Sequence, residues 1–527
     1  MPGRILVVDD LPDPRSTVQG ILEDAGYVVI SVSNKEDALR AVDSDRFHIA
    51  ILDVRLDEWD EDNRDGLDLM FTINEIDPTI AIIILTGYAD VEMVQDALQP
   101  DHNGNRPAFG FLNKSEMGQL VDYVQRALKV HVGLIEGLAI DDPSEVIPKL
   151  ASILRFSQSL KPATQTIIEE CQEALGKLFA DCTSIEIHPM QEGFSGVAVL
   201  KIVPVYRERG KGTECVVKIG ERALIEKELK RYETYIKGIG HRLPNALEIA
   251  RTHSLGGIIY TFAGMGNVRD FTSFFHFANI ETIKYALNSL YHETCPHQQG
   301  NAGTLNQNKD LCKIYLNQLH LSEAKFNKAL GKLINENRSF RKVHHNLKLI
   351  YKDGSLLTNP YEFALSANLY CDYFSYIIHG DLYGNNILID QHNETWLIDF
   401  ETAGDGPILQ DYASLENYVR LYLSDSEQLD NLIKWEKTLF LNDQISPNFP
   451  NEENNELVGK IHQTILIIRN LARQTKHFSD RAFLISLLFN ALRTTTFLEL
   501  SSNIREHALL SASLIADRIA KGRAINA

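Results

Sequence analysis

Two separate sets of polar residues in this sequence have the types and spacing that phosphoryl chemistry requires. The first set lies near the N-terminus and consists of Asp9, Asp10, Asp53, Thr86 and Lys114. A carboxylate nucleophile such as Asp53 needs a divalent cation to screen the incoming phosphoryl group, and Mg²⁺ binds oxygen ligands while keeping several waters. Neighbouring carboxylates could hold that cation, and a lysine and a hydroxyl could contact the phosphoryl oxygens. The set therefore predicts an aspartate that accepts a phosphoryl group in the presence of Mg²⁺.

The residues of this first set follow apolar runs that have the length and composition of strands. The five runs in this part of the chain are Ile5–Val8, Val28–Val32, Ile49–Leu52, Ala81–Leu85 and Phe109–Leu112. Near-continuous apolar strands that alternate with amphipathic helices indicate a parallel sheet covered on both faces. Such open sheets carry their chemistry beyond the carboxyl ends of the strands, so the polar residues are expected at one edge.

Residues 1–130 resemble the receiver domain of two-component response regulators. The resemblance implies that Asp53 is the phospho-acceptor and that Asp9 and Asp10 hold Mg²⁺ together with it. It also implies that Lys114 contacts the phosphoryl group, and that a sensor histidine kinase or another phosphodonor is a partner.

The same resemblance implies a switch within the domain, with Thr86 as the switch hydroxyl and Phe111 as the rotating aromatic. The sequence departs from the family where Ser115 stands in place of the usual proline. Extra residues are also present at Asp57–Arg64 and Pro100–Pro107, near the expected phosphorylation edge.

The second set of polar residues lies in a part of the chain that begins with short strands near Ser184. Its members are Lys218, Asp381, Asn386 and Asp399. Phosphoryl transfer from ATP needs an acid to position the acceptor hydroxyl, oxygen ligands for Mg²⁺ and a cation on the non-transferred phosphates. Asp381 suits the first role, and Asn386 and Asp399 suit the second. Asp381 and Asn386 also have the spacing of a kinase catalytic loop.

Lys218 suits the third role because it lies inside an apolar strand and so needs a charged partner. The following helix offers Glu226, Glu228 and Glu233 as partners. A turn between two earlier strands contains Gly193, Ser195 and Gly196, and glycines allow backbone amides to approach a phosphate closely. This turn is a weak signal by itself.

The chain from about Thr183 to Leu500 resembles the aminoglycoside phosphotransferase and choline kinase-like group of the protein-kinase fold. The segments that carry the resemblance are His379-Gly380-Asp381, Ile398-Asp399-Phe400-Glu401 and Asp411-Tyr412-Ala413. The resemblance implies that Asp381 is the catalytic acid and that Asp411 braces the catalytic loop. It implies Glu228 as the partner of Lys218, with Glu226 as the alternative.

These patterns predict a multidomain protein. We expect a doubly wound α/β receiver domain over residues 1–130, a helical connector over 131–182, a kinase-like N-lobe over 183–268 and a C-lobe over 269–527. The kinase-like part is expected to be a bilobal α+β fold with a largely helical C-lobe, a helical insert after the hinge and a helical tail. The amphipathic segments Glu145–Leu160 and Ala163–Phe179 predict the connector helices.

Charge and composition limit the classes of partner and the compartment that we expect for this protein. The formal net charge of the chain is −19, and most of it lies in the first 130 residues. Phosphate backbones bind basic surfaces, so a nucleic-acid partner is not expected for this part. No apolar run reaches the length of a membrane span, and six scattered cysteines without paired spacing indicate a reducing cytoplasm. The connector helices also allow a homodimer.

The sequence thus predicts a response regulator whose output is an ATP-dependent phosphotransferase, acting on a small-molecule hydroxyl under control of Asp53 phosphorylation. Two alternatives stay open. One is a nucleotide-binding pseudokinase that serves as a scaffold, and the other is a Ser/Thr protein kinase. Intact Lys218, Asp381, Asn386 and Asp399 favour an enzyme over a scaffold.

Overall fold

The structure of the chain is a computed structural model with two compact units. It describes residues 3–57, 59–60, 63–87, 97–99, 106–133, 137–156, 162–189, 196–238, 243, 245–261, 268–295, 303–337, 340–342, 348–441 and 456–525. The first unit comprises Met1–Ile225 and Leu247–Ile259, and the second comprises Glu226–Ala246 and Tyr260–Ala527.

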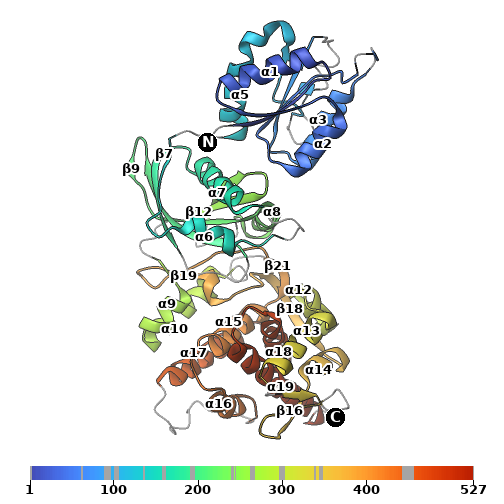
Figure 1. Cartoon of the computed structure of the whole chain (residues 1–527). Helices are drawn as coiled ribbons and strands as arrows, with labels where there is room; N and C mark the ends of the chain where they lie inside the picture. The colour runs from blue at the N-terminus through green and yellow to red at the C-terminus, as the bar shows by residue number, and fades with distance from the viewer. Residues whose placement is uncertain are drawn as a thin grey trace. The chain divides into compact units, whose positions relative to one another are not determined.

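The first unit begins with a five-stranded parallel sheet in the order β2-β1-β3-β4-β5 (Figure 1, blue). Its strands are β1 (Arg4–Val8), β2 (Val28–Val32), β3 (Ile49–Leu52), β4 (Ala81–Thr86) and β5 (Gly110–Asn113). The residues of β3 and β4 are buried throughout, as expected for parallel strands covered on both faces. The predicted parallel α/β domain is therefore confirmed.

Two layers of helices cover this sheet. The helices are α1 (Pro12–Asp24), α2 (Lys35–Ser44), α3 (Asp65–Ile76) and α5 (Leu120–Ala127), with a 3₁₀ turn η1 (Lys114–Gln119) before α5. Alternate strand residues point to opposite faces. Leu6 and Ala50 share a core with α2 and α3, whereas Ile5 and Ile49 share a core with α1 and α5.

The last helix of the receiver ends shortly after residue 127. After α5 the chain forms one π-helical turn, η2 (Leu128–Val132), and ends it at Gly133 with a φ of +70°. Glycine adopts this left-handed conformation without the steric cost of a side chain, so it is a common helix terminator.

The rest of the first unit is a second sheet in the order β11-β12-β10-β8-β7-β6, with β9 paired to β8. Its strands are β6 (Ala139–Asp141), β7 (Cys182–Pro189), β8 (Ala198–Tyr206), β9 (Gly210–Lys211), β10 (Cys215–Glu221), β11 (Asn245–Arg251) and β12 (Leu255–Thr261). Helices α6 (Val146–Ile153) and α7 (Thr164–Leu178) pack their apolar side chains against one face of this sheet.

The two helices expected in the connector therefore exist, but residues 131–182 do not form an independent helical linker. Strand β6 pairs in parallel with β7, and buried residues of α6 and α7, such as Leu150 and Leu175, belong to the core of the second sheet. An amphipathic pattern shows that one helix face is covered, but it does not show by what.

The second unit contains three small sheets, ordered β13-β19-β20, β14-β18-β21 and β15-β16-β17. The strands are β13 (Arg269–Asp270), β14 (Thr304–Asp310), β15 (Phe340–Lys342), β16 (Lys348–Tyr351), β17 (Leu356–Thr358), β18 (Tyr370–Ile378), β19 (Ile387–Ile389), β20 (Thr395–Leu397) and β21 (Gly404–Pro407). The region before β18, expected to be helical, is thus a mixture of helices and strands.

Helices make up most of the second unit. They are η3 (Tyr232–Ile236), α9 (Phe271–Phe277), α10 (Ile280–Ser289), η4 (Leu290–Thr294), α12 (Leu311–Gln318), α13 (Glu323–Asn337), α14 (Pro360–Ser366), η5 (Gly384–Asn386), α15 (Leu409–Leu421), α16 (Leu429–Leu441), α17 (Glu456–Arg473), α18 (Asp480–Thr496) and α19 (Ser502–Ile525). Helix α8 (Arg222–Arg231) begins in the first unit and ends in the second.

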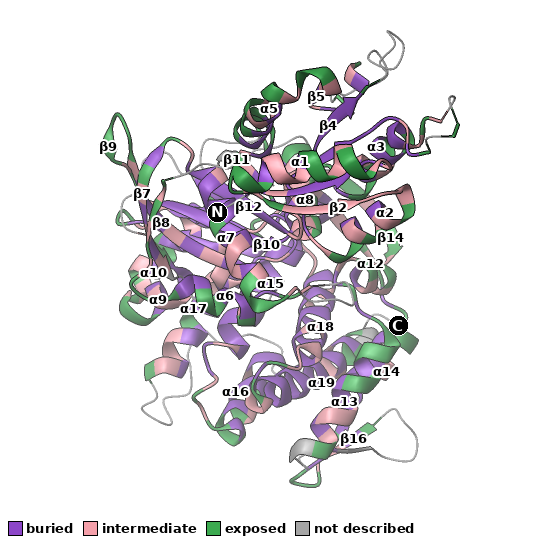
Figure 2. Ribbon diagram, turned by 45° about the horizontal axis from the view of Figure 1, so that its top comes forward, coloured by how far each residue is buried: buried purple, intermediate pink, exposed green. Residues whose placement is uncertain are grey.

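Helix α15 is the centre of this helical core, because all of its residues are buried. Its polar side chains are paired inside the core: Glu416 accepts two hydrogen bonds from Arg469 of α17, and Arg420 pairs with Glu436 of α16. Helix α18, which packs beside it, is also largely buried (Figure 2). Among the described residues, no helix combines the length and the hydropathy required of a membrane span.

Candidate functional site

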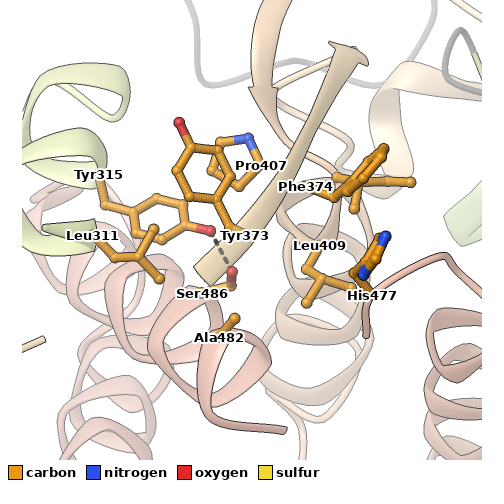
Figure 3. Close-up of a pocket in the computed structure, with 10 residues that line it drawn as sticks. Leu311, Tyr315, Tyr373, Phe374, Pro407, Leu409, His477, Ala482 and Ser486 are labelled. Carbon is orange, nitrogen blue, oxygen red and sulfur yellow. Dashed lines mark hydrogen bonds between the residues drawn. The ribbon is translucent and has the colours of Figure 1, made fainter. Parts of the chain in front are cut away.

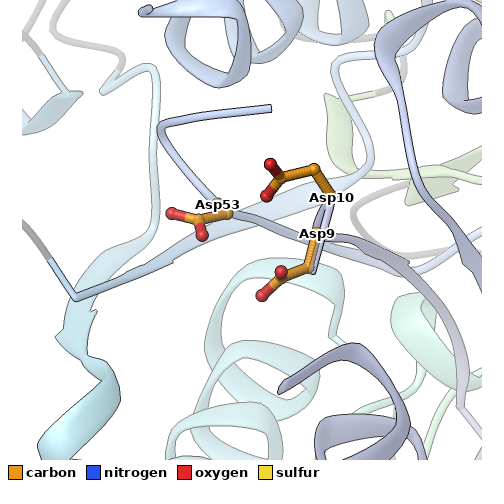
Figure 4. Close-up of side chains that lie close together, drawn as sticks. All are labelled: Asp9, Asp10 and Asp53. Atoms are coloured by element: carbon orange, nitrogen blue, oxygen red, sulfur yellow. The ribbon is translucent and has the colours of Figure 1, made fainter. Parts of the chain in front are cut away.

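Three aspartates meet at the carboxyl edge of the first sheet. Asp9 and Asp10 directly follow β1, Asp53 directly follows β3, and one carboxylate oxygen of each lies within 4.8 Å of the others (Figure 4). Asp53 is 7% exposed, and its buried Oδ1 accepts no hydrogen bond within the described part of the chain. Clustered carboxylates with a free buried oxygen fit a Mg²⁺ ion, which takes oxygen ligands and retains water.

Lys114 lies against two of these carboxylates. Its Nζ is 2.5 Å from Oδ2 of Asp53 and 2.6 Å from Oδ2 of Asp9. Burial alone would lower the pKa of Lys114, but its hydrogen bonds to Asp53 and Asp9 outweigh burial and raise it. Burial raises the pKa of Asp9, which the nearby lysine only partly offsets. Lys114 is therefore held as a cation where a phosphoryl group on Asp53 would carry negative charge.

The two predicted switch residues occupy the neighbouring strands. Thr86 ends β4, is 1% exposed and is paired in register with Asn113, the residue before Lys114. Phe111 lies on β5, partly buried against the core shared with α2 and α3. The structure thus gathers the predicted residues of the first set at one edge, as their positions after strands implied.

Gly66 is a residue of this site that the sequence did not reveal. It lies in the first turn of α3, where its backbone N donates to the Val54 carbonyl at 3.0 Å. A Cβ at this position would lie 1.7 Å from the carbonyl oxygen of Asp53. Only glycine fits this approach. The sequence did not reveal it because the extra residues Asp57–Arg64 lie between Asp53 and α3, so the distance along the chain from Asp53 to Gly66 is not a usable guide.

In the second unit, the segment containing Asp381 is held by a buried aspartate on α15. Asp411 accepts hydrogen bonds from the backbone N of His379 at 2.9 Å and of Gly380 at 2.8 Å. Gly380 has a φ of +82°, and a Cβ there would lie 2.7 Å from the Thr402 carbonyl. The bracing role expected for Asp411 is therefore present in the hydrogen bonds.

Asn386 closes the loop that Asp381 opens. Its Nδ2 donates to the Asp381 carbonyl at 2.8 Å, which leaves the amide oxygen as the atom that could bind a cation. In the β19–β20 hairpin Ile387 pairs with Leu397, and the Ile398 N donates to the Asn386 carbonyl at 3.1 Å. The residue after Ile398 is Asp399, so the two predicted metal ligands lie at the same open end of this hairpin.

Asp399 itself has an unusual backbone. Its φ is +70°, a left-handed conformation that costs a non-glycine residue about 1–3 kcal/mol and is concentrated at functional sites. The next residue, Phe400, donates its backbone N to Oε1 of Glu228 at 3.2 Å. Glu228 is buried and also accepts a hydrogen bond from the Tyr260 hydroxyl.

Arg493, on α18, is a second residue that the sequence did not reveal. Its Nη1 lies 2.5 Å from Oδ1 of Asp381, its Nη2 lies 3.3 Å from Oδ2, and its guanidinium lies over the rings of Tyr383 and Phe497. Burial alone would lower the pKa of Arg493, but the Asp381 carboxylate outweighs burial and raises it. The predicted catalytic carboxylate is thus ion-paired.

Lys218 lies on β10 in the first unit and is 2% exposed. Its neighbours Val217 and Ile219 belong to the core under α6 and α7, so the lysine points to the opposite face of the sheet. Glu228 belongs to the second unit, and the pairing of Lys218 with Glu228 stays a prediction.

The predicted glycine turn is only partly described. Gly193 and Ser195 lie outside the described residues. Gly196 is buried with a φ of +75°, and a Cβ there would lie 2.6 Å from the Arg155 side chain. The close neighbour of this glycine is thus a side chain of the protein itself, and its contact with a phosphate stays a prediction.

A small pocket in the second unit lies apart from these residues. It is lined largely by aromatic and aliphatic side chains of α12, β18, α15 and α18. The hydroxyl groups of Tyr315 and Ser486, which both line this pocket, form a hydrogen bond with each other (Figure 3). No residue of the two predicted sites lines it, and it has no role in the site.

Comparison with known proteins identifies the N-terminal part. A family model described as "Response regulator receiver domain" matches residues 5–125, and one described as "Ternary complex associated domain 9" matches residues 332–496. The response regulator receiver protein CpdR of Brucella abortus (strain 2308) is 30% identical over 125 residues, which cover 24% of this chain and 96% of that protein.

Longer relatives match over the same N-terminal part. The nitrogen assimilation regulatory protein NtrX of Azorhizobium caulinodans is 32% identical over 127 residues, 24% of this chain and 26% of NtrX. The C4-dicarboxylate transport transcriptional regulatory protein DctD of Rhizobium meliloti is 28% identical over 173 residues, 31% of this chain and 35% of DctD. The match therefore spans about a quarter to a third of these two relatives.

A solved structure is also similar in this region. The receiver domain protein (CheY-like) from Methanospirillum hungatei JF-1 is 24% identical, covers 24% of this chain and 95% of its own, and gives a TM-score of 0.21.

A parallel five-stranded α/β domain with clustered acids and a lysine at its carboxyl edge defines a phosphoacceptor domain. The chain belongs to the response regulator receiver family through residues 5–125, and is a two-component response regulator. A receiver domain implies a phosphodonor such as a histidine kinase.

Proposed function

We propose that the output of this response regulator is an ATP-dependent, kinase-like phosphotransferase that acts on a small-molecule hydroxyl and is controlled by Asp53 phosphorylation. The observation that carries the proposal is the brace that Asp411 gives to His379 and Gly380. A buried carboxylate that accepts two backbone N–H groups fixes the start of a loop, and here it fixes the residues directly before Asp381.

The roles proposed for the loop follow from its chemistry. Asp381 would accept the hydrogen bond, and then the proton, of the acceptor hydroxyl, whose oxygen forms a bond to the γ-phosphorus of ATP while the bond to the β-phosphate oxygen breaks. The products are the phosphorylated acceptor and ADP. Lys218, with Glu228 as its proposed partner, would contact the non-transferred phosphates.

Asn386 and Asp399 supply the oxygen ligands for Mg²⁺ in this proposal. Both lie at the open end of one hairpin, and their amide and carboxylate oxygens are ligands that Mg²⁺ accepts. When bound, the ion would neutralise phosphate charge during transfer. The strained backbone of Asp399 supports a functional position for this carboxylate.

In the receiver, Asp9, Asp10 and Asp53 would hold a second Mg²⁺. An oxygen of Asp53 would attack the phosphorus of the donor, and the donor's bond to that phosphorus would break. Lys114 is already in contact with Asp53 and would then pair with a phosphoryl oxygen.

A nucleotide-binding scaffold without turnover is the second candidate, and the Arg493–Asp381 ion pair favours it. The guanidinium occupies the two carboxylate oxygens that a catalytic base would use to accept the hydrogen bond of the acceptor hydroxyl. An enzyme would have to exchange this contact for one with the acceptor or phosphate. A scaffold would keep it.

Transfer of the γ-phosphoryl group from labelled ATP to a panel of small hydroxyl compounds tests the proposal. We expect transfer by the wild type and a fall of at least about 100-fold in Asp381→Asn, the typical contribution of a general base. Asp405→Asn is the matched control, because Asp405 is exposed on β21. ATP binding without transfer to any acceptor would establish the scaffold instead, and a labelled lysate protein in place of a metabolite would point to a protein kinase.

A further inference from the structure

Helix α3 connects the phospho-acceptor to the opposite edge of the receiver sheet. At its first turn, Gly66 packs directly on the Asp53 carbonyl and donates to Val54. The helix has 12 residues, a length of about 18 Å, and is followed by Asp77. A displacement at Asp53 therefore meets one end of a rigid element whose other end is Asp77.

Asp77 holds a buried polar cluster at that far edge. Its Oδ1 is 2.6 Å from Nη1 of Arg222, and its Oδ2 is 2.7 Å from Nδ1 of His253. The Asp77 side chain is 1% exposed, whereas the side chains of Arg222 and His253 are partly exposed. Burial alone would raise the pKa of Asp77, but the hydrogen bond from His253 and the charge of Arg222 outweigh it and lower the pKa. The carboxylate is therefore ionised, and we call these three residues the Asp77 latch.

The latch holds the start of α8. Arg222 is the first residue of that helix, and its backbone N donates to the Ser254 carbonyl at 2.9 Å. Six residues further along the same helix is Glu228, which accepts the backbone N–H of Phe400, the residue after Asp399. One continuous helix thus begins at the receiver contact and carries the side chain that holds the Asp399 segment.

A separate contact fixes the receiver beside the latch. Arg46 pairs with Glu169 of α7 at 2.7 Å, and His48 lies 3.1 Å from Glu173 of the same helix. Burial alone would raise the pKa of Glu173, but the His48 hydrogen bond and the Lys177 charge outweigh it and lower the pKa to about 2. This second contact holds the receiver on α7. A movement of α3 can therefore reach α8 while the receiver stays bound to α7.

We propose that phosphorylation of Asp53 is transmitted to the candidate catalytic loop through α3, the Asp77 latch and α8. The proposal rests on the proposed function for what is regulated, and on the hydrogen bonds and ion pairs of these elements for the route. Because coupling between two sites is reciprocal, ligands of the second unit should also change the phosphorylation equilibrium of Asp53.

Hydrogen exchange of the full chain, with and without acetyl phosphate and Mg²⁺, tests this route. Intact mass measures Asp53 phosphorylation in the same samples. In the wild type we expect phosphorylation to change the exchange rate of the α8 amides by at least about 5-fold, the lower range of measured coupling. In Asp77→Asn and Arg222→Gln we expect Asp53 phosphorylation to persist and the change in α8 to disappear.

Asp45→Asn is the matched control, because Asp45 is at the same receiver edge and pairs with Arg4 of the receiver. It should leave the α8 response as in the wild type. An equal α8 response in wild type and Asp77→Asn would overturn the proposal, as would phosphorylated wild type with no α8 response. The exchange readout needs no phosphoryl acceptor, so a protein that couples through the latch but transfers nothing would refute the proposed function alone.

Discussion

Among individual residues, Gly66 makes the closest backbone approach at the phospho-acceptor. An alanine Cβ at this position would lie 1.7 Å from the Asp53 carbonyl, so either α3 or the end of β3 would have to move. We expect Gly66→Ala to destabilise the first unit by about 2 kcal/mol, as overpacking does, and to slow phosphorylation by acetyl phosphate. Urea unfolding and intact mass measure the two effects. Gly20→Ala on α1 is the control, because nothing lies within 4 Å of its added Cβ; an equal loss in both variants would contradict the argument.

The Arg493–Asp381 ion pair gives a second prediction at this scale. Asp381→Asn leaves a largely buried guanidinium without its counter-charge, which we expect to cost about 3 kcal/mol of unfolding free energy in the second unit. Arg493→Gln added to Asp381→Asn should recover part of that loss, because no charge is then left unpaired. A double-mutant cycle from urea unfolding measures the coupling, and strictly additive losses would show that the pair contributes nothing.

The sequence predicted residues whose roles follow from local pattern and missed those that depend on distant contacts. Asp9, Asp53 and Lys114 follow strands, so the parallel sheet brings them together. Arg493 lies 112 residues from Asp381, and no spacing or periodicity connects the two. Its place in the site follows from the packing of α18, which a single sequence does not show.

Among the elements, we expect the turn before β12 to respond to pH through His253. The hydrogen bond to Asp77 raises the pKa of His253, although burial opposes it. A raised histidine pKa stabilises the latch fully below the unfolded pKa of about 6.5, and this contribution is lost as pH rises through the folded pKa. We therefore expect faster exchange at the start of α8 at pH 8.5 than at pH 6, after correction for intrinsic rates. His253→Gln should remove this difference, and a difference that persists in it would assign the effect to another group.

The elements that were predicted well are those whose pattern also indicates their neighbours. Apolar runs such as Ile49–Leu52 are buried on both faces, which only a central parallel strand requires. The sequence predicted helices α6 and α7 but assigned them to a connector, whereas both pack on the second sheet. Their amphipathic pattern is the same whether the apolar face packs on a sheet or on a partner domain. Strand β6, three residues long and placed between two helical regions, is too short to stand out from its surroundings.

For the molecule as a whole, the two compact units predict two unfolding transitions. Arg469→Gln should lower only the transition of the second unit, because it leaves Glu416 without its partner inside the helical core, a change of about 3–5 kcal/mol. Gly66→Ala should lower only the other transition. Differential scanning calorimetry separates the two, and a single transition shifted by both substitutions would show that the units unfold together.

The short path from η2 to β6 limits how this receiver can be exchanged by evolution or by engineering. Val132 ends the last helical turn and Ala139 begins a strand of the next sheet, and seven residue steps reach at most about 25 Å. A foreign receiver joined at this position would be kept close to the second sheet by the short linker. It would therefore have to present its own counterparts of Arg46 and Asp77 at the same edge. Receiver swaps should therefore succeed only when the transplanted domain also supplies these two contacts.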